Sequence, residues 1–187
     1  METVGTDEII VERALSGDAE AFGEIVRRWE RRIFALTYGI LGREEDARDA
    51  TQETFLAAFR NLRGFRGEAK VSSWLHRIAV NQCLTRQRRA KVRNESALDD
   101  APQTEFAATV AESPASVVEG RQRTVAVRRA LNGLPLELRQ IVVMKEFEEL
   151  TFREIAEALE LPLSTVKSRL YTGLKQLQLR LEKFSGE

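Results

Sequence analysis

Apolar residues recur at intervals of three and four along most of the chain, which is the spacing of one buried face of an α-helix. No segment sustains the strict alternation of apolar and polar residues that marks a half-buried strand. The pattern therefore predicts an all-helical protein.

The longest regular stretch predicts a core helix near the amino terminus. Its apolar residues are Phe22, Ile25, Val26, Trp29, Ile33, Leu36 and Ile40. Asp18 is placed to cap the start, because its carboxylate can accept hydrogen bonds from the free amides of the first turn. Gly42 is placed to end the helix, because glycine readily adopts the left-handed conformation found there.

Two more helices are expected in the first half of the chain. The first spans residues 44–62 and ends before Gly64. Its buried face consists of Ala47, Ala50, Phe55, Ala58 and Leu62. The second follows a loop over residues 65–71, is capped by Ser72 or Ser73, and runs out into a basic tail. Its apolar residues are Trp74, Leu75, Ile78, Ala79 and Leu84.

Periodicity is lost over residues 95–116, where five acids and two prolines stand without a single base. This composition is typical of a flexible acidic linker. Beyond it, helices are predicted over residues 118–131, 136–147, 152–159 and 165–181, the second of them after the start signal Pro135. Neither a long single core nor an internal repeat is visible, so we expect two small helical domains that can move relative to one another.

Residues 151–177 have the features of a helix-turn-helix. Thr151 and Glu154 form a capping box at the start of a short helix, and Pro162 makes the turn. Ser164 is expected to cap the second helix. The predicted inward positions are Ile155, Ala156, Leu159, Val166 and Leu170.

The outward side of the second helix offers groups that bind DNA. In such motifs the start of this helix enters the major groove, where Lys and Arg reach guanine edges or phosphates and Ser and Thr reach either. The residues predicted to contact DNA are Thr151, Ser164, Thr165, Lys167, Ser168, Arg169, Tyr171, Thr172 and Lys175. An ordinary amphipathic helical hairpin is the alternative.

The position of the charges matters more than their sum. The chain has 29 basic and 29 acidic residues, and a net charge of zero by itself argues against a nucleic-acid partner. Residues 71–94 and 161–181, however, contain bases and no acid. Two basic surfaces set apart from acidic ones are typical of a protein that contacts DNA at two places.

Composition excludes several other classes. The chain is 43% apolar and 31% charged, a globular profile without a membrane-spanning run or a signal peptide, so a cytoplasmic location is expected. One cysteine, Cys83, and one histidine, His76, cannot form a disulfide or a zinc cluster, and Cys83 is expected in the core. We expect no metal, cofactor or catalytic residue, because the chain lacks a phosphate loop and a paired nucleophile and base.

Residues 134–177 resemble region 4 of the extracytoplasmic-function (group IV) sigma factors of bacterial RNA polymerase, from the Leu-Pro at 134–135 through the TVKSRL at 165–170. The resemblance implies that this region reads the minus-thirty-five promoter element as duplex DNA. Thr172 and Leu174 depart from the pattern, because they replace basic residues that are common in relatives.

Residues 43–59, REEDARDATQETFLAAF, resemble the region 2 helix that docks on core polymerase. The resemblance assigns polymerase binding to Asp46, Asp49, Gln52, Glu53 and Leu56. These residues fall on one side of the predicted helix and form a mixed acidic and apolar face. A solvated acidic face is the alternative.

Residues 65–89 are similar to the promoter-melting segment of the same family. Melting needs a loop that receives an unstacked base, an apolar surface to hold it, and positive charge for the backbone. The residues assigned to the minus-ten element are Phe65, Arg66, Lys70, Arg77, Ile78, Asn81, Arg86, Arg88 and Arg89. Trp74 is expected to support this loop from the core.

The resemblance as a whole implies a sigma factor that binds core RNA polymerase, directs it to promoters and helps melt the minus-ten element. Region 2 is assigned to residues 1–94, the linker to 95–117 and region 4 to 118–187. The implied partners are the beta-prime clamp and beta flap of polymerase, duplex and melted promoter DNA, and an anti-sigma factor, without membrane insertion. A stand-alone helix-turn-helix regulator, which needs no polymerase, is the alternative.

Overall fold

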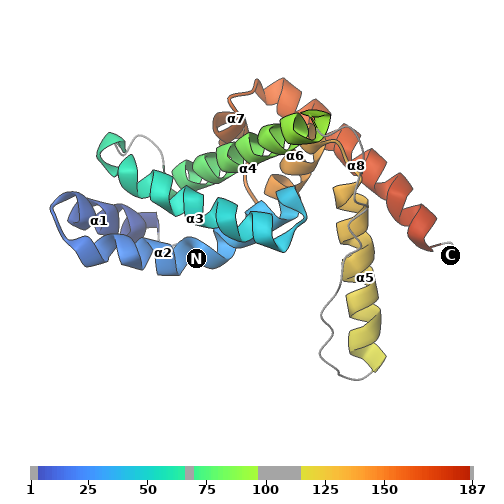
Figure 1. Ribbon diagram of the computed structural model, residues 1–187, viewed down its shortest axis with the longest axis horizontal. Helices are drawn as coiled ribbons and strands as arrows, with labels where there is room; N and C mark the ends of the chain where they lie inside the picture. Colours follow the sequence, from blue (N-terminus) through green and yellow to red (C-terminus); the bar gives the residue numbers. More distant parts are fainter. Residues whose placement is uncertain (1–3, 66–69, 97–114, 186–187) are drawn as a thin grey trace.

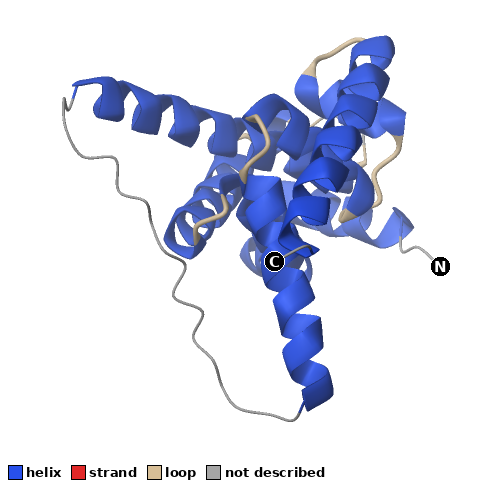
Figure 2. Cartoon of the chain, turned by 90° about the vertical axis from the view of Figure 1, so that its right-hand side faces the viewer, coloured by secondary structure: helices blue, strands red, loops and turns tan. Residues whose placement is uncertain are grey.

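The structure is a computed structural model that describes residues 4–65, 70–96 and 115–185, and every regular element in these ranges is helical (Figure 1, Figure 2). The helices are α1 (Val4–Leu15), α2 (Ala19–Leu41), α3 (Glu44–Arg60), α4 (Val71–Ser96), α5 (Ala115–Asn132), α6 (Leu136–Glu146), α7 (Phe152–Leu159) and α8 (Leu163–Ser185), with a 3-10 turn η1 (Leu62–Gly64) after α3. The all-helical prediction is confirmed.

Both predicted ends of the core helix α2 are confirmed. The Asp18 carboxylate accepts hydrogen bonds from the amides of Glu20 at 3.1 Å and Ala21 at 3.2 Å. Gly42 has a left-handed φ of 76°, and its amide donates to the Tyr38 carbonyl oxygen at 2.8 Å. The predicted apolar face of α2 is buried except for Val26, which is half-buried.

Helix α3 and the turn η1 bury all five of the predicted apolar residues. Two threonines share this buried face. The Thr51 hydroxyl donates to the Ala47 carbonyl oxygen at 2.7 Å, and Thr54 donates to the Ala50 carbonyl oxygen at 2.6 Å. These bonds within the helix satisfy the hydroxyls, so both side chains pack in the core.

The predicted serine caps of α4 and α8 are wrong. Helix α4 begins at Val71, before both serines, and the Val71 amide donates to the Glu8 carboxylate of α1 at 3.3 Å. Helix α8 begins at Leu163, so Ser164 lies inside its first turn. The Pro162 carbonyl oxygen accepts the first bond of α8, from the Thr165 amide at 2.9 Å.

Helix α1 was not predicted, yet it is tied closely to α2. Its Ile10 and Val11 are buried. The Asp7 carboxylate accepts hydrogen bonds from Arg28 Nη1 at 2.5 Å and from the Trp29 indole nitrogen at 3.0 Å. Helix α1 therefore completes the amino-terminal half of the molecule.

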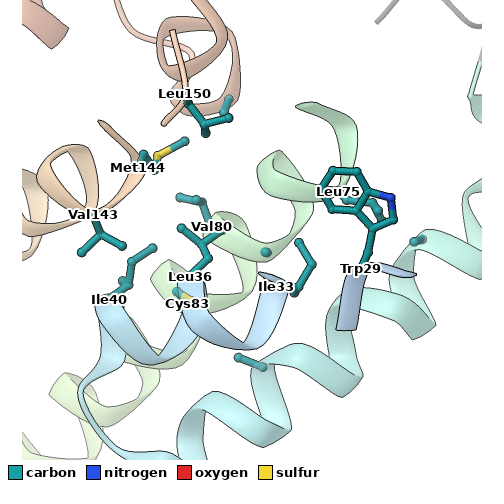
Figure 3. Close-up of a cluster of buried hydrophobic side chains, with 14 of the residues drawn as sticks. Trp29, Ile33, Leu36, Ile40, Leu75, Val80, Cys83, Val143, Met144 and Leu150 are labelled. Atoms are coloured by element: carbon teal, nitrogen blue, oxygen red, sulfur yellow. The ribbon is translucent and has the colours of Figure 1, made fainter. Parts of the chain in front are cut away.

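The two halves of the chain pack against one another, α6 on α2 and α7 on α4 (Figure 1). Their buried side chains form one continuous cluster, in which Val143 and Met144 of α6 lie beside Leu36 and Ile40 of α2 (Figure 3). The expectation that no single core exists is therefore wrong for this conformation. Apolar periodicity shows which face of a helix is buried, but it does not show which other helix covers that face.

Candidate nucleic-acid and polymerase interfaces

Helices α7 and α8 form the predicted helix-turn-helix. The Thr151 hydroxyl accepts a hydrogen bond from the Glu154 amide at 3.2 Å, and the Thr151 amide donates to the Glu154 carboxylate at 2.8 Å, which confirms the capping box. Burial raises the pKa of Glu154, but the hydrogen bonds from Thr151 and the nearby basic groups of Lys70 and His76 together outweigh it and leave this pKa below its ordinary value. Ile155, Val166 and Leu170 are buried as predicted, with Ala156 and Leu159 half-buried.

The residues of α8 that were predicted to contact DNA follow one side of the helix. Ser164, Lys167, Ser168, Tyr171, Thr172 and Lys175 are exposed, and Thr165 and Arg169 are half-buried. Their spacing of three and four residues places them in a stripe along the helix. Thr151 is exposed at the start of α7. The geometry leaves this stripe open to a ligand.

Two residues outside α8 contact its basic side chains. The Lys167 ammonium lies 5.7 Å from the ring centroid of Phe152, within the range of a cation–π interaction. The Arg169 guanidinium lies 3.5 Å from the Glu137 carboxylate of α6. Sequence reasoning missed both neighbours, because they come from other elements and carry no local signal.

Three of the five residues predicted to bind polymerase face Arg86 of α4. Its Nη2 atom lies 2.8 Å from Asp49 Oδ2 and 4.0 Å from Glu53 Oε1, and its Nη1 atom lies 3.9 Å from Asp46 Oδ1. Arg86 was predicted to contact DNA phosphates. The structure places its guanidinium between α3 and α4, where it links these helices, and its contact with phosphate stays a prediction.

The other two predicted polymerase-binding residues, Gln52 and Leu56, line an open groove between α2 and α3. The groove has a volume of about 930 Å³ and is lined on its apolar side by Phe22, Phe55 and Phe59. Leu56 is 46% exposed and Phe59 is 59% exposed. Large apolar side chains that share an exposed groove mark an interaction surface. Phe59 was not among the residues predicted to bind polymerase. Its place in residues 43–59, the segment that resembles the polymerase-docking helix, was the signal that could have identified it.

The predicted minus-ten residues lie at the start of α4 and along it. The Phe65 ring packs on the half-buried Trp74, with 5.0 Å between ring centroids, so Trp74 contacts the first residue of the predicted loop. Lys70 is exposed, and Arg66 lies outside the described residues. On α4 itself Arg77, Asn81, Arg88 and Arg89 are exposed, whereas Ile78 is half-buried. The Arg77 guanidinium pairs with Glu160, the residue that ends α7.

Comparison with known families matches both halves of the chain. Residues 25–93 match sigma-70 region 2, and residues 124–177 match sigma-70 region 4. The chain is also 38% identical over 164 residues to the ECF RNA polymerase sigma factor SigM of Mycobacterium tuberculosis, an alignment that covers 88% of this chain and 79% of SigM. This chain belongs to the extracytoplasmic-function sigma factors.

Other relatives align over most of this chain and over most of their own length. The ECF RNA polymerase sigma factor SigW of Bacillus subtilis is 31% identical over 176 residues, which cover 91% of this chain and 94% of SigW. Among solved structures, CnrH in complex with the cytosolic domain of CnrY has a TM-score of 0.70 at 23% identity, and the match covers 95% of this chain and 97% of CnrH. The fold is therefore shared over nearly the whole length.

Membership in this family decides between the two functions considered for this chain, a sigma factor and a stand-alone helix-turn-helix regulator. The protein is a sigma factor that acts in transcription initiation, and not a stand-alone regulator. Sigma factors are not enzymes. The region 2 match carries this decision, because a helix-turn-helix alone occurs in many kinds of DNA-binding protein.

The only cysteine of the chain, Cys83, offers no exposed thiol. Cys83 is in the core as predicted, and burial raises the pKa of its thiol to about 12. In the part of the chain that the structure describes, no three His, Cys, Asp or Glu side chains are grouped so that they could hold a metal ion. Within the same residues, no helix combines the length and apolar character that a membrane span requires.

Proposed function

We propose that this sigma factor distributes its contacts over three helical surfaces. The groove between α2 and α3, with the carboxylates of α3, binds core polymerase. Helix α4 and the loop before it hold the melted minus-ten strand, and α8 reads the minus-thirty-five duplex. Residues 1–94 then act as region 2 and residues 118–187 as region 4. The observation that carries the assignment is the exposed stripe of α8, in which Lys167, Tyr171 and Lys175 stand on one side of the helix.

The polymerase-binding surface is mainly apolar in this proposal. Arg86 partly neutralises the carboxylates of α3, and Leu56 and Phe59 present apolar area beside them. A groove of this kind suits a helix of the partner, with apolar anchors in its centre and charges at its rim. The beta-prime clamp is the proposed partner for this groove, and the beta flap for region 4.

The minus-ten surface combines stacking area with charge. Phe65 and Trp74 form an aromatic pair next to the loop, and Asn81 presents an amide that can read a base edge. Each base that stacks on an aromatic side chain contributes about 1–3 kcal/mol. One or two such bases offset the few kcal/mol needed to unpair the duplex locally. Melting by this surface therefore needs no ATP-driven motor.

Run-off transcription tests the function directly. Core polymerase is supplied with promoter fragments selected by the reconstituted holoenzyme, with and without the protein. We expect transcripts from one start site only when the protein is present. Selective DNA binding by the protein alone, with transcription unchanged, would support a stand-alone regulator instead.

An anti-sigma protein is a further proposed partner. One solved relative of similar fold, RpoE of Bartonella quintana, was crystallised with the anti-sigma factor NepR, at a TM-score of 0.68 and 17% identity. Such a partner would hold this chain away from polymerase in the cytoplasm. Capture of the tagged protein from unstressed cells tests this, and we expect a second protein that lowers run-off transcription when it is added back.

A further inference from the structure

The outward side of α8 carries two hydroxyl groups that are already bound within the helix. The Ser168 hydroxyl donates to the Thr165 carbonyl oxygen at 3.0 Å, and the Thr172 hydroxyl donates to the Ser168 carbonyl oxygen at 2.9 Å. A hydroxyl has a single hydrogen to donate. In this arrangement both groups can accept a hydrogen bond from a ligand, but neither can donate one.

Close packing of α8 on α6 decides which residues of α8 face outward (Figure 1). Leu170 is buried, and a β-carbon on Gly173 would lie 2.8 Å from Cγ2 of Val142, closer than two carbon atoms approach without a shift. These two residues of α8 mark its inner side. Thr172 is two positions beyond Leu170, which on an α-helix is nearly the opposite side, and its side chain is exposed. The packing thus presents Thr172 to a ligand.

Position 172 offers no positive charge, although basic residues are common there in relatives. The nearest basic side chains of α8 are Arg169 and Lys175, each three positions away. Arg169 is half-buried and its guanidinium lies 3.5 Å from the Glu137 carboxylate of α6. Lys175 is exposed, but it belongs to the next turn of the helix. Position 172 itself therefore offers a methyl group and a hydrogen-bond acceptor in place of a cation.

A methyl group beside an acceptor suits an A·T base pair. In the major groove thymine is the one base that presents a methyl group, and adenine presents an amino group that donates a hydrogen bond. Guanine presents two acceptors, for which the Thr172 hydroxyl has no hydrogen left. Cytosine also presents an amino group, so the methyl contact is what distinguishes the A·T pair. An arginine or lysine at this position would instead favour guanine.

We propose that Thr172 determines part of the promoter specificity of this sigma factor, and that its methyl group contacts the methyl group of a thymine in the minus-thirty-five element. The inference rests on the proposed function, in which α8 reads that element as duplex DNA. The preferred promoters then carry an A·T pair opposite Thr172. Ser168 has the same internal hydrogen bond but no methyl group, so it makes no such contact.

Replacement of thymine by uracil tests the methyl contact, because uracil lacks only the methyl group and keeps every hydrogen-bonding group of thymine. Each thymine of the minus-thirty-five element, on either strand, is replaced singly in a promoter fragment selected by the reconstituted holoenzyme. Competition between fragments for the holoenzyme measures the relative affinity. We expect one uracil to lower the affinity about fourfold, which corresponds to about 0.8 kcal/mol for one buried carbon group.

Two substitutions at position 172 separate the methyl group from the hydroxyl. Thr172→Ser removes the methyl group, so it should bind the thymine fragment about fourfold more weakly and show no further loss with uracil. Thr172→Val removes the hydroxyl and keeps a methyl group, so it should remain sensitive to uracil. Neither should change the slope of log affinity against log salt, because no phosphate contact is lost. Circular dichroism checks that both variants are folded.

The outcomes separate this inference from the function on which it rests. An undiminished uracil effect in Thr172→Ser would assign the methyl contact to another residue and overturn the proposal. Promoter binding by the holoenzyme without any uracil effect, or a selected element without thymine on either strand, would overturn it as well. If the proposed function fails, the protein and core polymerase form no specific promoter complex, whichever base is present.

Discussion

At the scale of single residues, substitution of Lys167 gives the most direct test of duplex binding by α8. Lys167→Ala should weaken binding to the minus-thirty-five duplex and lower the slope of log affinity against log salt by about one, because one phosphate contact releases about one counterion. Binding is measured by fluorescence anisotropy at several salt concentrations. Lys183→Ala, an exposed lysine near the end of the same helix, is the matched control and should change neither quantity. A loss at one base position with an unchanged slope would instead assign Lys167 to base reading.

The capping box makes a pH prediction. The pKa of Glu154 in the folded protein lies below its ordinary value of 4.5, because the hydrogen bonds from Thr151, with the basic groups of Lys70 and His76, outweigh the effect of burial. The ionised carboxylate therefore stabilises the fold fully above that ordinary value, and this stabilisation is lost as the pH falls through the lower, folded pKa. Thr151→Val should raise the pKa of Glu154 and reduce stability by roughly 1 kcal/mol at neutral pH. Carbon-detected NMR of the carboxyl group measures the pKa, and an unchanged value would contradict the role of Thr151.

At the scale of helices, the groove between α2 and α3 is the proposed polymerase contact. Leu56→Asp should weaken binding to core polymerase at least tenfold, since burying an unpaired carboxylate costs several kcal/mol. Ile9→Asp is the matched control, because Ile9 is 56% exposed on α1, outside the groove, and Leu56 is 46% exposed. Co-sedimentation with core enzyme measures both variants. Equal binding by both would remove the groove from the polymerase interface.

Arg86 and Arg88 are two basic residues of α4 that the sequence does not distinguish. In the structure Arg86 pairs with a carboxylate of α3, whereas Arg88 is exposed. Arg86→Ala should destabilise the protein by up to about 1 kcal/mol, because Asp49 and Glu53 of α3 lose their nearest cation and Asp46 keeps only Arg43. Arg88→Ala should leave stability unchanged and weaken binding to a single-stranded minus-ten oligonucleotide. Urea unfolding and oligonucleotide binding are measured on both. Equal effects of the two substitutions on DNA binding would return Arg86 to the DNA surface.

At the scale of the whole molecule, the packing of α6 on α2 should couple the unfolding of the two halves. Both tryptophans, Trp29 and Trp74, lie in the first half, so their fluorescence reports that half alone, whereas circular dichroism reports every helix. Gly39→Leu should separate the two urea transitions, because its side chain collides with Val143. Gly23→Leu is the matched control on the same helix, where the new side chain meets only the flexible end of Arg27. Coincident transitions in Gly39→Leu would show that the halves unfold together without this contact.

The sequence alone predicted what depends on neighbours within about four positions. Helical periodicity located α2, α3, α6 and α7 closely, and the caps formed by Asp18, Gly42 and the Thr151–Glu154 pair were confirmed, because each involves bonds inside one or two turns. The order of motifs along the chain also predicted the family. These features survive any rearrangement of the helices in space.

Only the tertiary structure decided which side chains from distant segments meet. It placed Glu8 of α1 at the start of α4, where serine caps were expected, and brought Arg86 of α4 to the carboxylates of α3. It also joined the two halves through Arg139 and Glu148. The apolar period of a helix specifies that one face must be buried, but many partners can bury it equally well. Shape and charge complementarity between distant helices make that choice, and the sequence shows them only once the chain has folded.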